Sequence, residues 1–219
     1  MGTQSDKDGG RSWRGKSGDE RRRLRRDALI EAGIELFGTR GYRATSVKAV
    51  CDQAGLTERY FYEAFDDRED LLSAIYDILI QDAATVVLAA LAEHETDLKA
   101  SVAAGLGAFA REVTRDPRRA RIQEIEVVAV SEALEEKRRG AIHAFADLIV
   151  AKAREMGAEE KDGAIRLDVI ALGLVGAVNE QLIDFVLGHL DLSLEELVAN
   201  QVAVFEALAT VMIPDSALD

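Results

Sequence analysis

The chain has 219 residues, 48% of them hydrophobic, with two prolines and a formal net charge of -13 at pH 7. This length allows one or two domains with a sizeable core, and the shortage of proline, with no strand-like alternation, favours an all-α fold. The single Cys51 excludes an internal disulfide, the three histidines share no ligand spacing, so we expect no metal or cofactor, and the acidic total does not suggest a nucleic-acid partner.

The charge is unevenly distributed along the chain. Residues 1–50 contain 12 Lys and Arg against 7 Asp and Glu, a net charge of +5, whereas residues 51–219 carry a net charge of -18. An acidic body would repel nucleic acid except at the basic end and so would orient docking. Residues 1–20 are rich in Gly, Ser and charge, and we predict that they form a disordered basic arm. The arginines that follow can reach phosphates or a minor groove, or can simply be a solvated helix start: Arg21, Arg22, Arg23, Arg25 and Arg26.

Residues 29–65 contain three short amphipathic segments separated by two tight turns. Gly41 ends the first segment and Gly55 supplies the second turn. Thr45 is placed to accept hydrogen bonds from the free N–H groups of the second helix, and Thr57 from those of the third. The apolar stripes consist of Leu29, Ala32, Gly33, Leu36, Phe37, Val47, Val50, Cys51, Ala54, Phe61, Ala64 and Phe65. This pattern predicts an N-terminal three-helix helix-turn-helix DNA-binding domain.

The third segment has an outward face suited to a DNA major groove. Its members can meet base edges and phosphates, and they are Glu58, Arg59, Tyr60, Tyr62 and Glu63. Arg59 can pair bidentately with guanine, whereas Glu58 or Glu63 can accept from cytosine. Alternatively, Glu58 lies in the first helical turn, where the helix dipole stabilises a negative charge.

A longer pattern of residues at fixed offsets runs through four consecutive helices. It consists of Leu29-Ile-Glu-Ala-Gly-Ile-Glu-Leu-Phe37, Gly41-Tyr-Arg-Ala-Thr-Ser-Val47, Ala54-Gly-Leu-Thr57, Tyr62, Phe65 and Arg68-Glu-Asp-Leu-Leu72. This pattern resembles the N-terminal domain of the tetracycline-repressor (TetR) family. The resemblance implies phosphate contacts by Thr45, Tyr62 and Arg68 and a recognition helix over residues 57–63.

Three residues depart from the pattern that is frequent in that family. Arg59 stands where many members have glycine, Glu63 where histidine is frequent, and Ala64 where a bulky aromatic or histidine is frequent. The operator sequence therefore cannot be transferred from relatives.

Beyond Phe65 the chain reads as a series of longer helices. Asp67, with Asp70 three residues on, can cap a long helix that links the head to the rest of the protein. We place the DNA-binding domain at 21–68 and a helical effector-binding and dimerisation domain at 69–219. The further helices are expected at about Thr96 to Thr114, Pro117 to Val130, Ser131 to Met156, Ile165 to Leu187 and Ser193 to Met212. Ser193 with Glu196 is expected to form a capping box at the start of the last of these helices.

The last two predicted helices favour a homodimer. Helix 193–212 has apolar residues on more than one face, and helix 165–187 adds small residues that allow close backbone approach, Gly173, Gly176 and Ala177. Pairing these helices with their copies would give a four-helix interface. A thick monomeric core is the alternative. The family resemblance also implies pairing through the last two helices.

The middle helices are expected to surround an effector pocket. Polar residues on these largely apolar segments are candidates to orient a ligand: Tyr76, Gln81, Gln123, Glu124, Glu126, His143 and Asn179. Each can instead be a satisfied core group or lie on a solvated face. Asn179 follows an apolar run, so its amide needs a partner in a ligand, a neighbouring chain or the backbone. The apolar lining predicts a lipophilic effector.

These features together predict a dimeric, ligand-responsive transcriptional regulator. We expect a repressor that a small lipophilic effector releases from a near-palindromic double-stranded DNA operator, although an activator would use the same fold. The sequence has no phosphate loop, nucleophile elbow or Glu-x-x-His pair, so an enzyme is not expected. The alternatives are a helical-bundle small-molecule carrier and a protein-interaction scaffold without DNA binding, the latter favoured by the acidic residues Glu63, Asp66 and Asp67. No signal peptide and no run long and uncharged enough to span a bilayer is evident, which predicts a cytoplasmic protein with no membrane partner.

Overall fold

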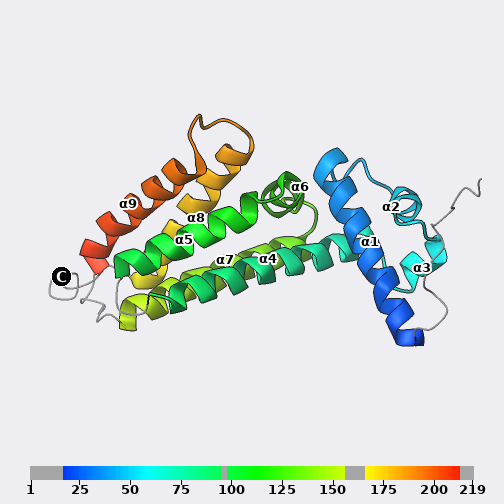
Figure 1. Ribbon diagram of the computed structural model, residues 1–219, viewed down its shortest axis with the longest axis horizontal. Helices are drawn as coiled ribbons and strands as arrows, with labels where there is room; N and C mark the ends of the chain where they lie inside the picture. The colour runs from blue at the N-terminus through cyan, green and yellow to red at the C-terminus, as the bar shows by residue number, and fades with distance from the viewer. Residues whose placement is uncertain (1–16, 95–97, 156–165, 213–219) are drawn as a thin grey trace, which may run out of the picture.

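The computed structural model describes residues 17–94, 98–155 and 166–212, and this part of the chain confirms the all-α fold. Helices α1 to α3 form a head at one end, from which α4 leads into a body made of α4 to α9 (Figure 1). The helices are α1 (Gly18–Arg40), α2 (Val47–Ala54), α3 (Glu58–Tyr62), α4 (Arg68–Ala92), α5 (Leu98–Thr114), α6 (Pro117–Arg121), the π-helix η1 (Ile122–Glu126), α7 (Glu132–Glu155), α8 (Leu167–Val186) and α9 (Leu194–Met212).

Helix α1 begins inside the segment that was predicted to be a disordered arm. The Ser17 hydroxyl accepts a hydrogen bond from the Glu20 N–H at 3.1 Å, and this cap starts the helix at Gly18. The prediction is therefore wrong for residues 18–20, while residues 1–16 lie outside the described residues. Helix α1 ends at Gly41, whose φ of 91° is accessible to glycine at little cost.

The caps of the next two helices differ from the prediction. Ser46, not Thr45, caps α2, because the Ser46 hydroxyl accepts from the Ala49 N–H at 3.2 Å. The Thr45 hydroxyl instead donates to the Gly41 carbonyl at 2.8 Å. Thr57 occupies the cap position of α3, but its side chain makes no capping hydrogen bond.

The head and the adjoining end of the body share one apolar core. Phe37 of α1, Phe61 of α3 and Leu71 of α4 are all fully buried in it. Ile122 of η1 and Leu134 of α7 belong to the same cluster of buried side chains. The body therefore packs directly on the head.

The body is a bundle in which α4 packs on α5, α7 on α8, and α5 on α9. Asp67 caps α4 as predicted, since its Oδ1 accepts from the N–H groups of Glu69 and Asp70 at 2.8 and 2.9 Å. The predicted capping box of α9 is also confirmed. The Glu196 N–H donates to the Ser193 hydroxyl at 3.2 Å, and the Ser193 N–H donates to the Glu196 carboxylate at 2.7 Å.

The single helix predicted from Pro117 to Val130 is wrong. Helix α6 makes little more than one turn, capped by Asp116, and then widens into η1, where the Val127 N–H donates to the Ile122 carbonyl at 3.3 Å. Ala129 follows with a φ of 56°, which ends the helical run. The predicted helix limits at Thr96, Met156 and Ile165 lie outside the described residues.

Two described helices, α4 and α8, are long and apolar enough to cross a membrane by length and composition alone. The expectation that no run reaches this limit is therefore wrong. Both helices are packed against other helices, α4 on α5 and α8 on α7, as the helices of a bundle core would be. Length and composition thus do not distinguish these helices from core helices.

Candidate DNA-binding surface and ligand cavity

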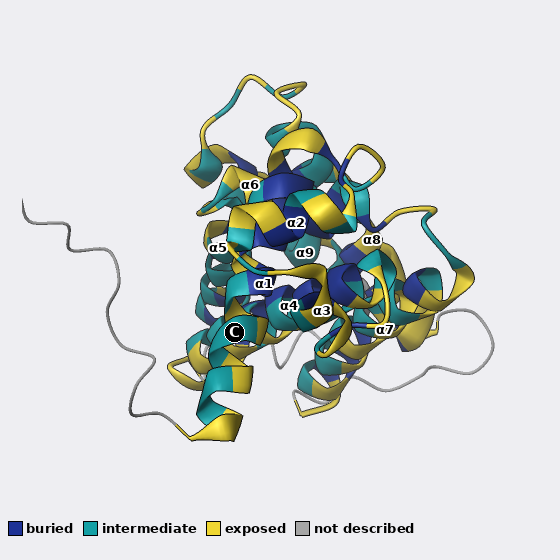
Figure 2. Ribbon diagram, turned by 90° about the vertical axis from the view of Figure 1, so that its right-hand side faces the viewer, coloured by how far each residue is buried: buried dark blue, intermediate teal, exposed yellow. Residues whose placement is uncertain are grey.

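Helix α3 is fixed to the head by its aromatic residues and presents polar ones outward. Phe61 and Phe65 are buried, with ring centroids 5.8 Å apart. Tyr62 is 58% exposed, and the Arg59 side chain is 84% exposed. Seen from the head, α2 and α3 turn exposed faces toward the viewer (Figure 2). Glu58 and Thr57 are also exposed.

Ion pairs and ring contacts position the outward side chains of α3. The Arg59 Nε donates to a Glu63 carboxylate oxygen at 3.0 Å, and Arg25 of α1 lies 3.7 Å from the other oxygen. The Arg25 guanidinium also stacks on the Tyr60 ring, 4.4 Å from its centroid. Glu63 is thus bracketed by two arginines, which gives it a role in holding Arg59 in the folded head.

Thr45 and Arg68 have structural roles that the sequence did not reveal. Thr45 is 1% exposed, so its side chain is not available to a phosphate, which corrects that part of the prediction. The Arg68 guanidinium donates to the carbonyls of Tyr42 and Thr45 and lies 4.9 Å from the centroid of the Tyr42 ring. Arg68 therefore clamps the connection between α1 and α2. Beside this clamp, Ser46 and Lys48 are exposed, and the prediction omitted both.

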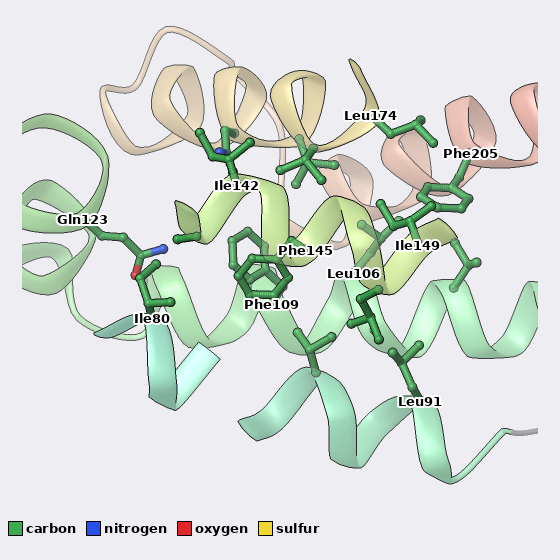
Figure 3. A pocket seen from close by; sticks show the side chains of 18 of the residues that line it. Ile80, Leu91, Leu106, Phe109, Gln123, Ile142, Phe145, Ile149, Leu174 and Phe205 are labelled. Carbon is green, nitrogen blue, oxygen red and sulfur yellow. The ribbon is translucent and has the colours of Figure 1, made fainter. Parts of the chain in front are cut away.

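A cavity of about 180 Å³ lies between α4, α5, α7, α8 and α9. Its lining is mainly aliphatic and aromatic, and Figure 3 shows Phe109 and Phe145 meeting at its middle, with Leu91 and Phe205 toward one end and Gln123 at the other. The centroids of the two phenylalanine rings are 5.4 Å apart. A cavity of this size and lining suits an apolar molecule or an apolar chain.

Four of the seven predicted effector residues line this cavity: Tyr76, Gln123, Glu124 and Asn179. The other three do not. Gln81 and His143 are exposed on the outer faces of α4 and α7, and Glu126 is turned toward the head. Arg138 and Ser101 line the cavity but were missed, because neither a charged residue nor a small serine marks the inner face of a helix in sequence.

The polar end of the cavity is built around the buried Glu124. Its carboxylate accepts a hydrogen bond from the Gln123 amide at 3.0 Å. Burial raises the pKa of the Glu124 carboxyl to about 7, against the lowering effects of the Gln123 hydrogen bond and the Arg138 charge. Burial, followed by the charge of Glu124, also raises the pKa of the Tyr76 hydroxyl.

Glu126, two residues further along η1, joins the body to the head. One carboxylate oxygen accepts from the backbone N–H of Tyr42 at 2.7 Å, and the other accepts from the Arg121 Nε at 2.8 Å. The Arg121 guanidinium also donates to the Thr39 carbonyl at 3.3 Å. The same short helix thus lines the cavity and contacts the connection between α1 and α2.

Helix α6 packs closely against α1 at Gly38. A Cβ atom at Gly38 would lie 2.4 Å from the Cβ of Arg118 and 2.6 Å from its Cα. The Arg118 guanidinium donates to the Glu35 carboxylate of α1 at 2.6 Å. We refer to the contacts made by α6 and η1 with α1 and Tyr42 as the head–body joint.

Helices α8 and α9 have apolar side chains that the described chain leaves exposed. Val169 and Leu172 lie on α8, Leu187 directly follows it, and Val204 lies on α9, with exposed fractions between 37% and 59%. At Gly173 and Gly176 of α8, a Cβ atom would meet no other atom within 4 Å. This face is open to close approach by another helix.

Comparison with known proteins agrees with this architecture. Residues 29–75 match the family model of bacterial regulatory proteins of the tetR family. The HTH-type transcriptional repressor KstR2 of Rhodococcus jostii is 35% identical over 68 residues, 31% of this chain, and the match spans only 30% of that relative's length.

Solved structures of similar fold extend over most of the chain. The fatty acid degradation regulator FadR from Bacillus halodurans superposes with a TM-score of 0.71 at 16% identity, covering 86% of this chain and 95% of that one. FadR from Bacillus subtilis, in complex with stearoyl-CoA, superposes with a TM-score of 0.67 at 15% identity, covering 81% of this chain and 96% of that one. A putative TetR-family regulator from a Rhodococcus species superposes with a TM-score of 0.67 at 19% identity, covering 86% of this chain and 100% of that one.

The head and the arrangement of the body together define a helix-turn-helix protein with a helical second part. Residues 29–75 match the tetR family of bacterial regulatory proteins, as the sequence pattern predicted, and the solved TetR-family regulator from Rhodococcus has a similar fold over most of the chain.

Proposed function

We propose that the protein is a dimeric transcriptional regulator, a repressor that leaves its operator when a lipophilic molecule enters the cavity. The exposed face of α3 is the observation that carries this proposal. Phe61 and Phe65 hold the helix in the head, while Arg59 and Tyr62 project from it. Short, rigidly anchored helices of this kind read base edges in a major groove. A protein that acts on bacterial DNA is expected in the cytoplasm.

Two copies would pair through α8 and α9. The exposed apolar side chains and open glycines of these helices support a self-complementary helical interface. A twofold dimer would place two α3 helices on successive half-sites of a near-palindromic operator.

The cavity supports a ligand-controlled mechanism. It is apolar over most of its length, and the solved relative from Bacillus subtilis holds stearoyl-CoA, so a lipophilic effector fits both the lining and the fold. A ligand that displaces η1 would also move Glu126, which binds the Tyr42 backbone. A 100-fold loss of DNA affinity requires about 2.7 kcal/mol of coupling, similar to the energy of one or two buried hydrogen bonds to a charged group.

The scaffold alternative draws less support from the acidic residues near α3. Glu63 pairs with Arg59 and Arg25, Asp67 caps α4, and the Asp66 N–H donates to Asp70. These acids therefore have local structural partners that explain them without a protein ligand.

The test is selection of binding sites from random duplex DNA with purified protein. Wild type should enrich an inverted repeat. Arg59→Ala should relax preference at individual bases, at a cost of about 1–3 kcal/mol, whereas Tyr62→Ala should weaken all sites alike. Arg139→Ala, which removes an exposed arginine of α7, is the matched control and should leave the selected sequence unchanged.

Affinity for the selected site should fall steeply as salt increases, because phosphate contacts release counterions. Failure to enrich any sequence at low salt would refute specific DNA binding and leave the carrier or scaffold alternative.

A further inference from the structure

The two ends of the cavity differ in chemistry. Tyr76 of α4, Gln123 and Glu124 of η1, and Arg138 of α7 gather at the end next to the head. Lys152 lines the cavity too, but it lies fourteen residues further along α7, on the order of 20 Å away along the helix axis. Between the two ends the lining is aliphatic and aromatic (Figure 3).

Glu124 lacks the surroundings of a structural carboxylate. A buried carboxylate that serves the fold is normally satisfied by several donors, often backbone N–H groups. Within the described part of the chain, the hydrogen bond recorded for the Glu124 carboxylate comes from the neighbouring Gln123 amide. Glu124 is 8% exposed, and it borders the cavity.

The positive charge nearest to Glu124 is already engaged. Arg138 directs Nε and Nη2 toward the Glu135 carboxylate, at 3.0 and 2.8 Å. No Arg138 nitrogen is recorded within ion-pair distance of Glu124 among the described residues, although its charge acts on that carboxyl from further away. The positive charge of Arg138 is balanced by the negative charge of Glu135. Among the described cavity-lining residues next to the head, Glu124 therefore contributes a negative charge and Tyr76 a neutral hydroxyl.

We propose that Glu124 recognises the ammonium head of a lipophilic amine, whose apolar part lies along Phe109 and Phe145 toward Leu91. A cation beside the Glu124 carboxylate would supply further hydrogen-bond donors and balance its negative charge. The raised pKa of Glu124 agrees with a carboxyl that lacks such a partner when the cavity is empty. This inference rests on the proposed ligand-binding function of the cavity and names its ligand class.

Three probes of equal chain length test the proposal: octylamine, octanol and octanoate. Isothermal titration at pH 8 should show octylamine binding at least about tenfold more tightly than octanol, with octanoate weakest. Glu124→Gln should reduce octylamine binding to the level of octanol and leave octanol binding unchanged. Glu136→Gln, which removes an exposed carboxylate from α7, is the matched control and should keep the preference for the amine.

The comparison within wild type stands even if the Glu124 variant folds poorly. Octanoate binding as tightly as octylamine would overturn the proposal, and so would a Glu124→Gln protein that keeps the amine preference. If octanol and octanoate bind but octylamine has no advantage, the ligand class is wrong and the lipophilic cavity stands. If none of the three binds, both fail, whereas DNA-site selection reports on the DNA-binding function separately.

Discussion

The head–body joint can be tested by Glu126→Gln, which keeps the shape of the side chain and removes its charge. Glu126 currently accepts from the Tyr42 N–H at 2.7 Å and from the Arg121 Nε at 2.8 Å, and its side chain is 12% exposed. Glutamine retains one acceptor oxygen, but its NH₂ group cannot accept from the second donor. One of the two charge-assisted bonds is therefore lost, and one donor is left without its acceptor.

We expect this loss to lower the free energy of unfolding by about 2 kcal/mol, since hydrogen bonds to charged groups contribute about 1.5–3 kcal/mol each. Urea unfolding followed by circular dichroism measures the change. Glu136→Gln makes the same chemical change at an exposed site and should shift the free energy by less than about 0.5 kcal/mol.

The same variant should also weaken communication between cavity and DNA. An intact ligand affinity with a smaller ligand-induced loss of operator affinity is the expected result, because linkage requires a contact that differs between the two states. If Glu126→Gln unfolds at the same urea concentration as the Glu136→Gln control and responds to ligand like wild type, the reasoning on this joint is refuted.

Three further predictions follow from contacts described above. Gly38→Ala should destabilise the protein by about 1–3 kcal/mol in a thermal melt, because its Cβ would meet the Arg118 backbone at 2.6 Å; an unchanged melting temperature would contradict this. Arg68→Lys should cost about 1–2 kcal/mol in urea unfolding, since an ammonium cannot reproduce the guanidinium contacts with the two carbonyls and the Tyr42 ring; equal stability would argue against the clamp. The pKa of Glu124 in the folded protein, about 7, exceeds its ordinary value of 4.5, so protonated Glu124 stabilises the fold. This contribution to the free energy of unfolding is fully present below pH 4.5, and up to about 3 kcal/mol of it is lost as the pH rises through 7. Glu124→Gln should therefore gain stability relative to wild type between pH 5 and pH 8, and a difference independent of pH would exclude this pKa.

Local signals were the part of the fold that the sequence predicted well. The Asp67 cap and the Ser193 and Glu196 capping box depend on residues within one turn, and both are present. The choice between Thr45 and Ser46 as the cap of α2 was missed, because both are hydroxyl residues and only packing in the head decides which one is buried.

The cavity was harder to predict because its helices are apolar over much of their circumference. Periodicity could not show that Gln81 and His143 face outward while Tyr76 and Asn179 face the cavity. The widened turn at η1 leaves no local sequence signal that separates it from a regular helix. Glu126 was therefore predicted to bind the effector, whereas its carboxylate accepts a hydrogen bond from the Tyr42 backbone in the head.

The position of η1 has a consequence for protein engineering. Glu124 and Glu126 stand two residues apart, one bordering the cavity and the other bonded to the head, and Gly38 fits against the neighbouring α6. The head and body are thus not interchangeable modules: a chimaera that combines this body with a foreign head must carry over Gly38 and the backbone conformation at Tyr42. Biosensors built from this chain should instead vary the cavity residues and keep the native pair of head and body.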